Sequence, residues 1–246
     1  MNKIVYLILI IGIVSCQDRK PKIENIDTEN LTQIQIDSIL TEFKFQYEKP
    51  IILDSTNQIL IPISTELLER KTSYSKDGYY SDDFPRYWNV LFYNRSTGKT
   101  NLLTNEKFRI SEIYAKNSDN EYREKENILN GKILYEISDI DYNKDGKLNS
   151  HDPEFLFISE LDGNGLQRIS PKNEDLVHYE VIQKSREIIF ETRRDINNDS
   201  IFNSEDEFVW YKSKIENNQW KNVEIVDSLN RKKIEKLYFE QWLKKK

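Results

Sequence analysis

The residues best suited to chemistry lie in a stretch that begins at Asp141 and ends at Asp152. Counted from Asp141, oxygen-bearing side chains occupy positions 1, 3, 5, 9 and 12 and glycine occupies position 6: Asp141, Asn143, Asp145, Asn149 and Asp152, with Gly146. Oxygens at alternating positions can surround a hard cation, which takes about six to eight oxygen ligands. The backbone carbonyl of Lys147, at position 7, would add one more. The spacing therefore predicts a calcium-binding loop.

A second stretch repeats this spacing 54 residues further along the chain. Its predicted ligands are Asp195, Asn197, Asp199, Asn203 and Asp206, with the backbone carbonyl of Ile201 at position 7. Ser200 stands at position 6, where the first stretch has glycine. If this position needs a left-handed backbone, serine costs about 1 kcal/mol or more, which predicts weaker binding. Residues 73–83 stand at the corresponding place in an earlier unit, keep Asp77-Gly78 and lose the ordered ligands, so we expect no metal there.

The alternative interpretation of both stretches is that they are solvated, Asn-rich turns. Two matches at equivalent places in the repeat favour the metal over a chance match. Carboxylates packed this closely repel each other when no cation is present. A cation bound only by the folded chain would therefore stabilise the fold. We therefore expect calcium to be structural rather than regulatory, and external calcium concentrations suffice even for weak sites.

Both stretches resemble known calcium loops. The order Asp-x-Asn-x-Asp-Gly in residues 141–146 resembles the EF-hand loop, and Asp152 in place of the usual final Glu resembles the loop of dockerin modules. The flanks differ from a helix-loop-helix unit, because residues 133–137 and 155–158 have the composition of strands. We therefore expect a calcium loop inserted between strands.

The elements that must position these loops form an internal repeat. The pattern of hydrophobic strand, turn and second strand occurs at residues 88–104, 154–170 and 207–226, and is weakest at the turn of the last copy. Each copy follows another strand-like segment, at 59–64, 132–138 and 187–192, and further candidate strands lie at 110–114 and 176–182. Alternating apolar and polar residues indicate half-buried antiparallel strands. The predicted fold is mainly β, with three antiparallel meander units at about 50–104, 110–170 and 176–226 within a domain at 23–226. Pro62 predicts an edge strand or a bulge.

One repeat resembles a known family. Residues 156–175, Leu-Phe-Ile-Ser-Glu-Leu-Asp-Gly-Asn-Gly-Leu-Gln-Arg-Ile-Ser-Pro-Lys-Asn-Glu-Asp, followed by residues 187–191, resemble the TolB-like or WD40-like repeat of periplasmic β-propellers. The resemblance covers about residues 50–226 and implies blade-like units. Propellers usually have about 4 to 8 blades, whereas only three units are counted. An open partial propeller, a curved stack of sheets and half of an oligomeric ring remain alternatives.

Short helices are expected at both ends of the β domain. Residues 31–43 predict a helix that leads into a strand within 45–53. Asp227 or Ser228 can cap a helix within 227–246, because Ile234, Leu237 and Trp242 recur near helical spacing and lysines gather at its end. We expect this second helix to cover the sheet as a lid, and a partner-binding role is the less favoured alternative.

The first residues have the composition of a targeting segment. Lys3 precedes an apolar run at 4–14, which is too short to span a bilayer and predicts a signal peptide at 1–15. The run ends in Ile13-Val14-Ser15-Cys16, which resembles the lipobox of bacterial lipoproteins. The resemblance implies that Cys16 is lipidated and that residues 16–22 form a tether to the membrane, with the outer membrane as the expected location, facing the periplasm or the cell surface. A plain secretory peptide and an uncleaved anchor are the alternatives, and both still export the chain.

Composition and motifs limit the function classes. The formal net charge of −6 gives no basic footprint for nucleic acid. The only histidines are His151 and His178, and the chain has no nucleophile elbow, zinc-protease motif or phosphate-binding glycine loop. The favoured hypothesis is a non-enzymatic, calcium-binding envelope lipoprotein that acts as a binding or scaffold module for an envelope protein or glycan. The alternative is a carbohydrate- or peptide-active hydrolase, for which paired carboxylates such as Glu205 and Glu207 would be candidates.

Overall fold

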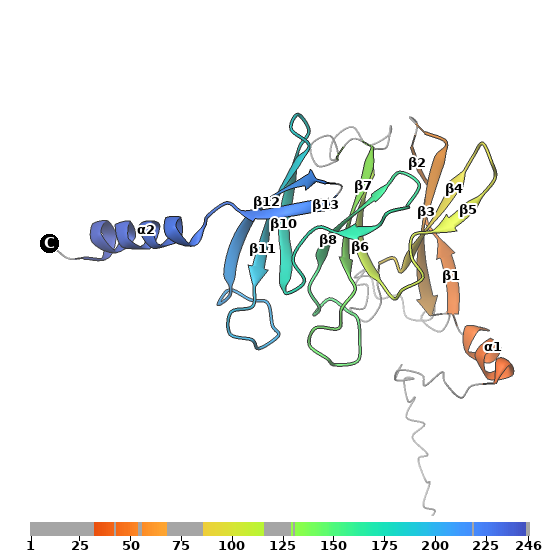
Figure 1. Cartoon of the computed structure of the whole chain (residues 1–246). Helices are drawn as coiled ribbons and strands as arrows, with labels where there is room; N and C mark the ends of the chain where they lie inside the picture. The colour runs from red at the N-terminus through yellow and green to blue at the C-terminus, as the bar shows by residue number, and fades with distance from the viewer. Residues whose placement is uncertain are drawn as a thin grey trace, which may run out of the picture.

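Figure 1 shows a computed structural model of the chain, which describes residues 32–41, 43–53, 56–67, 86–115, 129, 131–217 and 219–244. The predicted signal peptide, Cys16 and the tether lie outside these residues. The same is true of residues 73–83, the place predicted to hold no metal.

The described residues form three antiparallel sheets that follow one another along the chain. The first contains β1 (Phe43–Tyr47), β2 (Ile51–Ile52), β3 (Gln58–Leu67), β4 (Asn89–Asn94) and β5 (Thr100–Leu102), in the order β1-β3-β4-β5 with β2 beside β3. The second contains β6 (Arg109–Tyr114), β7 (Lys132–Ser138), β8 (Phe155–Glu160) and β9 (Gln167–Arg168), in sequence order. The third contains β10 (Glu174–Ile182), β11 (Glu187–Arg194), β12 (Glu207–Glu216) and β13 (Gln219–Glu224), also in sequence order.

These sheets confirm the predicted mainly β fold with three antiparallel units. The first unit differs from a simple meander, because β1 and β2 both pair with β3, and β1 lies before the predicted start near residue 50. The predicted strand at 132–138 matches β7 at both ends, and the other predicted strands overlap observed ones. Figure 1 shows the sheets side by side in a row. Each sheet in the described part of the chain is open, so the finer expectation of propeller blades stays a prediction.

The middle sheet is buried on both faces. Alternate residues of β7 and β8, such as Tyr135 and Phe157, pack with Phe92 of the first sheet in one apolar cluster. The intervening residues, such as Leu156, pack with Phe190 of the third sheet in a second cluster. The expectation of half-buried strands is therefore wrong for the middle sheet. Its continuous apolar run, Phe155 to Ile158, is the composition that a doubly covered strand requires.

A close backbone approach joins the first two sheets. Gly163, in the turn between β8 and β9, has φ +81°, and a Cβ there would lie 2.4 Å from Cε2 of the fully buried Phe92. Only glycine satisfies both the left-handed backbone and this short distance. The turn thus lies directly on the side chain that occupies the centre of the first sheet.

Pro62 was predicted to mark an edge strand or a bulge, and the first of these alternatives is wrong. It lies in β3, which pairs with β4 on one side and with β1 and β2 on the other. The Pro62 carbonyl accepts a hydrogen bond of 2.9 Å from the Glu48 N–H, in the connection between β1 and β2. A strand residue directs its nitrogen and its carbonyl to the same side, so the nitrogen of Pro62 faces the gap between these two short strands. No ladder hydrogen bond is lost there.

The helices lie outside the sheets. Helix α1 (Gln33–Thr41) confirms the predicted N-terminal helix. Helix α2 (Ser228–Tyr238) is capped by Asp227, whose side chain accepts the Asn230 N–H at 2.8 Å, and continues as the π-helical turn η2 (Phe239–Leu243). The predicted lid is wrong, because no residue of α2 or η2 is buried and the helix projects away from the sheets (Figure 1). Within the described residues, no helix has the length and apolar character needed to cross a bilayer.

Candidate metal centre

The two predicted loops occupy the same place in two successive sheets. The first, residues 141–152, lies between β7 and β8, and the second, residues 195–206, lies between β11 and β12. Each loop therefore connects the second and third strands of its sheet. Figure 1 shows both loops beside each other at one edge of the molecule. Strands flank both loops, as the sequence predicted.

In the first loop, backbone N–H groups converge on the predicted ligand side chains. Asp141 accepts the Asp145 N–H at 3.1 Å through Oδ1 and the Gly146 N–H at 2.9 Å through Oδ2. Asn143 Oδ1 also accepts the Asp145 N–H, at 2.9 Å, and Asp145 Oδ1 accepts the Lys147 N–H at 2.8 Å. These bonds wrap the first half of the loop around its own carboxylates.

The last ligand position closes this loop. Asp152 is 4% exposed, and its two oxygens accept the N–H groups of Tyr142 and Asn149, each at 2.9 Å. Asp152 therefore ties the beginning of the loop to its end. Leu148, at position 8, is buried, as expected for a residue that fixes the loop against the sheet.

The second loop repeats these hydrogen bonds at equivalent positions. Asp195 Oδ2 accepts the Ser200 N–H at 3.1 Å, Asn197 Oδ1 accepts the Asp199 N–H at 3.0 Å, and Asp199 Oδ1 accepts the Ile201 N–H at 2.8 Å. The buried Asp206 accepts the N–H groups of Ile196 at 3.2 Å and of Asn203 at 2.9 Å. Each bond has its counterpart 54 residues earlier. The loops differ at the Oδ1 atom of the first ligand position, because Asp195 accepts the Asn198 N–H at 2.6 Å there, whereas Asp141 accepts the Asp145 N–H. Apart from this bond, two loops with different intervening residues share one hydrogen-bond pattern.

Backbone torsions follow the same equivalence. The left-handed residues are Lys144 (φ +59°) and Gly146 (φ +84°) in the first loop, and Asn198 (φ +58°) and Ser200 (φ +63°) in the second. Position 6 is therefore left-handed in both loops, which was the condition for strain at Ser200. The second loop has the geometry of the first at an added backbone cost of about 1–2 kcal/mol.

The donor chemistry of the loops suits a calcium ion. A carboxylate offers about four lone-pair sites, so Asp141 and Asp145 accept their N–H groups and keep sites for a cation. Asn143 and Asn149 would supply amide oxygens and Lys147 its backbone carbonyl, as Asn197, Asn203 and Ile201 would in the second loop. In the described part of the chain, no three His, Cys, Asp or Glu side chains already form a group that could hold a metal. The three aspartates of each predicted ligand set are therefore not gathered into such a group, and the proposed sites also depend on amide and backbone carbonyl oxygens.

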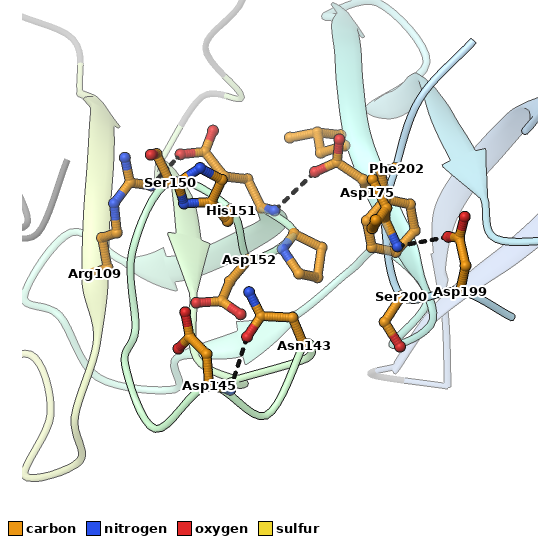
Figure 2. A pocket seen from close by; sticks show the side chains of 14 residues that line it. Arg109, Asn143, Asp145, Ser150, His151, Asp152, Asp175, Asp199, Ser200 and Phe202 are labelled. Atoms are coloured by element: carbon orange, nitrogen blue, oxygen red, sulfur yellow. Dashed lines mark hydrogen bonds and ion pairs between the residues drawn. The ribbon is translucent and has the colours of Figure 1, made fainter. Parts of the chain in front are cut away.

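A cleft of about 990 Å³ separates the two loops. Figure 2 shows Asn143, Asp145 and Asp152 on the side of the first loop, and Asp199, Ser200 and Phe202 on the side of the second. The loops also touch, because the rings of Tyr142 and Phe202 lie 5.1 Å apart between centroids. Burial, the charge of Asp195 and a hydrogen bond with this carboxylate raise the pKa of Tyr142. Tyr142 therefore links the first loop to the first ligand position of the second.

Three further ionisable residues line the cleft, and each has a structural partner. Arg109 Nη1 forms an ion pair of 2.7 Å with Glu154, and Asp175 Oδ1 accepts the Glu154 N–H at 2.9 Å (Figure 2). Burial, together with the charge of Glu154, raises the pKa of Asp175 to about 6, although that N–H bond and Arg193 oppose the shift. These contacts connect β6 and β10 through Glu154, the residue before β8, at the rim of the cleft. The sequence pattern did not predict that these three ionisable side chains lie together.

The histidines and the paired carboxylates considered for catalysis lie in separate surroundings. His151 lines the cleft, and its Nδ1 lies 2.9 Å from Asn149 Oδ1. His178 is an exposed strand residue beside Glu180. Glu207 forms ion pairs with Arg194 and Arg231, whereas the Glu205 N–H donates to Asn203 in the second loop.

The residues that the sequence analysis missed are Tyr142, Arg109 and Asp175. Their roles depend on contacts between different sheets, such as that of Tyr142 with Phe202. No local spacing indicates such a contact. Arg109 and Asp175 lie in the first two residues of β6 and β10, at the edge of the sheets where β7 and β11 lead into the loops.

In comparison with known proteins, the chain matches no protein-family model and no curated sequence.

Proposed function

We propose that the chain is a calcium-binding lipoprotein of the bacterial cell envelope, in which calcium stabilises a binding or scaffold module built from three sheets. The observation that carries the proposal is the hydrogen-bond equivalence of residues 141–152 and 195–206. Both loops share the ligand spacing, the left-handed positions and the buried final aspartate. A shared ligand accounts for the retention of these features in two repeated loops whose other residues differ.

The role of calcium follows from electrostatics and linkage. Asp141, Asp145 and Asp152 are held in one short loop, where their charges repel each other. A divalent cation removes this repulsion and binds only when the loop is folded. At a calcium concentration 100 times the dissociation constant, one site stabilises the fold by about 2.7 kcal/mol. For a domain of this size, this shift raises Tm by about 5–10 °C.

The module is proposed to reach the membrane through lipid on Cys16. The support is the sequence of residues 1–16, an apolar run that ends in a lipobox-like segment. The expected partners are an envelope protein or a glycan, and the expected location is the outer membrane. Incorporation of labelled palmitate tests the anchor. We expect the full chain to be labelled and Cys16→Ser to remain unlabelled.

Calcium titration of the chain from Gln17 onward, followed by thermal melting, tests the metal. We expect Tm to rise with calcium in the wild type and to rise by a smaller amount in Asp145→Ala and in Asp199→Ala. Asp162→Ala is the matched control, since Asp162 also accepts a backbone N–H in a turn, from Asn164 at 3.0 Å, but lies outside both loops. It should keep the full calcium response. A folded wild type whose Tm does not respond to calcium would refute the proposal.

A further inference from the structure

The C-terminal helix presents large apolar side chains to solvent. Leu229 is 77% exposed and Trp242 is 75% exposed, and Ile234, Leu237, Tyr238, Phe239 and Leu243 are also exposed. Burial of such side chains is worth about 1.5–3 kcal/mol each, so a helix that leaves all of them in water lacks its partner. The partner must lie outside the described part of the chain.

The helix is amphipathic. Ile234, Leu237 and Tyr238 follow each other at intervals of three and four residues, and Trp242 follows at the next turn, so they share one face. Lys232, Lys233 and Lys236 lie on the opposite face and are exposed, and Leu229 and Phe239 share that face by the same spacing. Aromatic and aliphatic side chains on one face, with lysines on the other, are typical of helices that lie in a membrane interface.

The charge of this segment differs from that of the rest of the chain. Residues 227–246 hold seven Lys or Arg and three Asp or Glu, a net charge of +4, whereas the whole chain has −6. The remaining residues therefore carry −10. An anionic surface attracts the helix and repels the sheets, so charge selects the helix as the point of contact. Each Lys or Arg near such a surface contributes about 1 kcal/mol.

The first turn of the helix is fixed to the third sheet. Asp227 caps it, and Arg231 forms an ion pair with Glu207 at the start of β12. The exposed apolar residues from Ile234 onward lie beyond this attachment. Figure 1 shows α2 at the opposite end of the row of sheets from α1. The apolar face is thus held at one end of the molecule, where the sheets do not cover it.

We propose that α2 and η2 dock on the surface of an anionic lipid membrane, with the face of Ile234, Leu237 and Trp242 inserted among the lipids and the lysine face toward the headgroups. This contact depends neither on the proposed lipid at Cys16 nor on calcium. The membrane is favoured over a second copy of the helix because two helices of net positive charge repel each other.

Fluorescence of Trp242 tests the proposal in the full chain. The chain has four tryptophans, and the difference between the full chain and Trp242→Phe isolates the signal of residue 242. The full chain is added to brominated phosphatidylcholine vesicles with and without phosphatidylglycerol. The apolar residues 4–14 can attach the chain to both kinds of vesicle. A difference in quenching between anionic and neutral vesicles therefore reports the contact of the helix and not that of residues 4–14. We expect quenching of Trp242 on the anionic vesicles only.

A charge variant makes the test quantitative. Replacing Lys232, Lys233 and Lys236 together by Gln should lower helix association about 100-fold, since each lysine contributes about fivefold. Gln supports a helix about as well as Lys, so the helix itself is kept. The matched control, Lys172→Gln with Lys184→Gln, removes exposed lysines from the third sheet and its approach and should leave quenching unchanged.

Two results would overturn the proposal. Equal quenching on neutral and anionic vesicles, or none on either, would remove the anionic membrane as the partner. A lipid-free dimer that dissociates in Trp242→Ser, detected by sedimentation equilibrium, would assign the apolar face to a second copy. Neither result bears on the calcium response or on lipidation of Cys16, so the two proposals fail separately.

Discussion

Ser200 is the residue at which the second loop departs from the first, and the departure has a calculable effect. Its φ of +63° is left-handed, which costs a non-glycine residue about 1–2 kcal/mol. Glycine avoids this cost but loses about 0.5–1 kcal/mol more backbone entropy on folding. Ser200→Gly should therefore increase the free energy of unfolding by about 0.5–1 kcal/mol. In a domain of this size, Tm should rise by about 1–4 °C.

The assay is thermal melting in excess chelator, so that any calcium effect is absent. Ser204→Gly is the matched control, because Ser204 lies in the same loop and is not among the residues with positive φ. It carries only the entropic cost and should lower Tm slightly. Gly146→Ser, the reverse change at the equivalent position (φ +84°), should lower Tm by about as much as Ser200→Gly raises it. If Ser200→Gly lowers Tm as Ser204→Gly does, the strain argument is refuted.

Two further predictions concern the sheets. Gly163→Ala should destabilise the fold by about 2–4 kcal/mol, because the added Cβ would clash with Phe92 and the backbone of residue 163 is left-handed. Gly98→Ala is the control and should cost about 1 kcal/mol, because residue 98 is also left-handed (φ +69°) but nothing lies within 4 Å of its Cβ position. Urea unfolding compares the two variants, and equal losses of stability would exclude the close approach. Burial raises the pKa of Glu136 from 4.5 to about 7; a hydrogen bond from Tyr114 opposes the shift and the charge of Glu154 adds to it. Between these two pH values, the folded state retains a proton that the unfolded chain releases. Stability from this group is present below about pH 4.5 and is lost as pH rises through 7. Glu136→Gln should remove this decline in a series of melts against pH, and an unchanged pH dependence would contradict the assigned cause.

The strands were predictable because each carries a local signal. β7 was predicted with the correct ends, since its apolar residues are bounded by Gly131 and by the polar residues after Ser138. The burial of both faces of the middle sheet was not predicted, although Phe155 to Ile158 contains four apolar residues in succession. Alternating apolar and polar residues in the outer sheets suggested that all strands are half-buried. Which sheet is covered on both faces depends on how the three sheets stack, and no local pattern gives that order.

The helix at residues 228–243 shows a different limit of sequence reasoning. Its spacing predicted the helix and its cap, because both depend on residues within a few positions of Asp227. Its supposed position over a sheet was wrong, because an apolar face indicates only that a partner exists.

The loops show how far local pattern extends into the site. Ligand spacing predicted two equivalent loops between strands, and it gave Asp141 and Asp195 the role of metal ligands, which stays a prediction. The N–H groups that these two side chains accept were not predicted, although the bonds span only three to five residues. The contact of Tyr142 with Phe202 spans two sheets and has no such signal. The loops and their place between strands were therefore predictable, and the pairing of the two loops was not.

The relative affinity of the two loops depends on more than the glycine at position 6. Residues 141–152 hold three Asp and two Lys, whereas residues 195–206 hold three Asp, one Glu and no Lys or Arg, so the second loop has three more negative charges. At about 8 Å in water, three charges attract a divalent cation by about 3 kcal/mol before screening. Screening over one Debye length, about 8 Å at physiological ionic strength, reduces this to about 1 kcal/mol. This gain is as large as the cost of the left-handed serine. Ser200 adopts its left-handed φ as part of the folded loop, so its strain lowers the free energy of unfolding, whereas the charge difference acts on calcium affinity and favours the second loop.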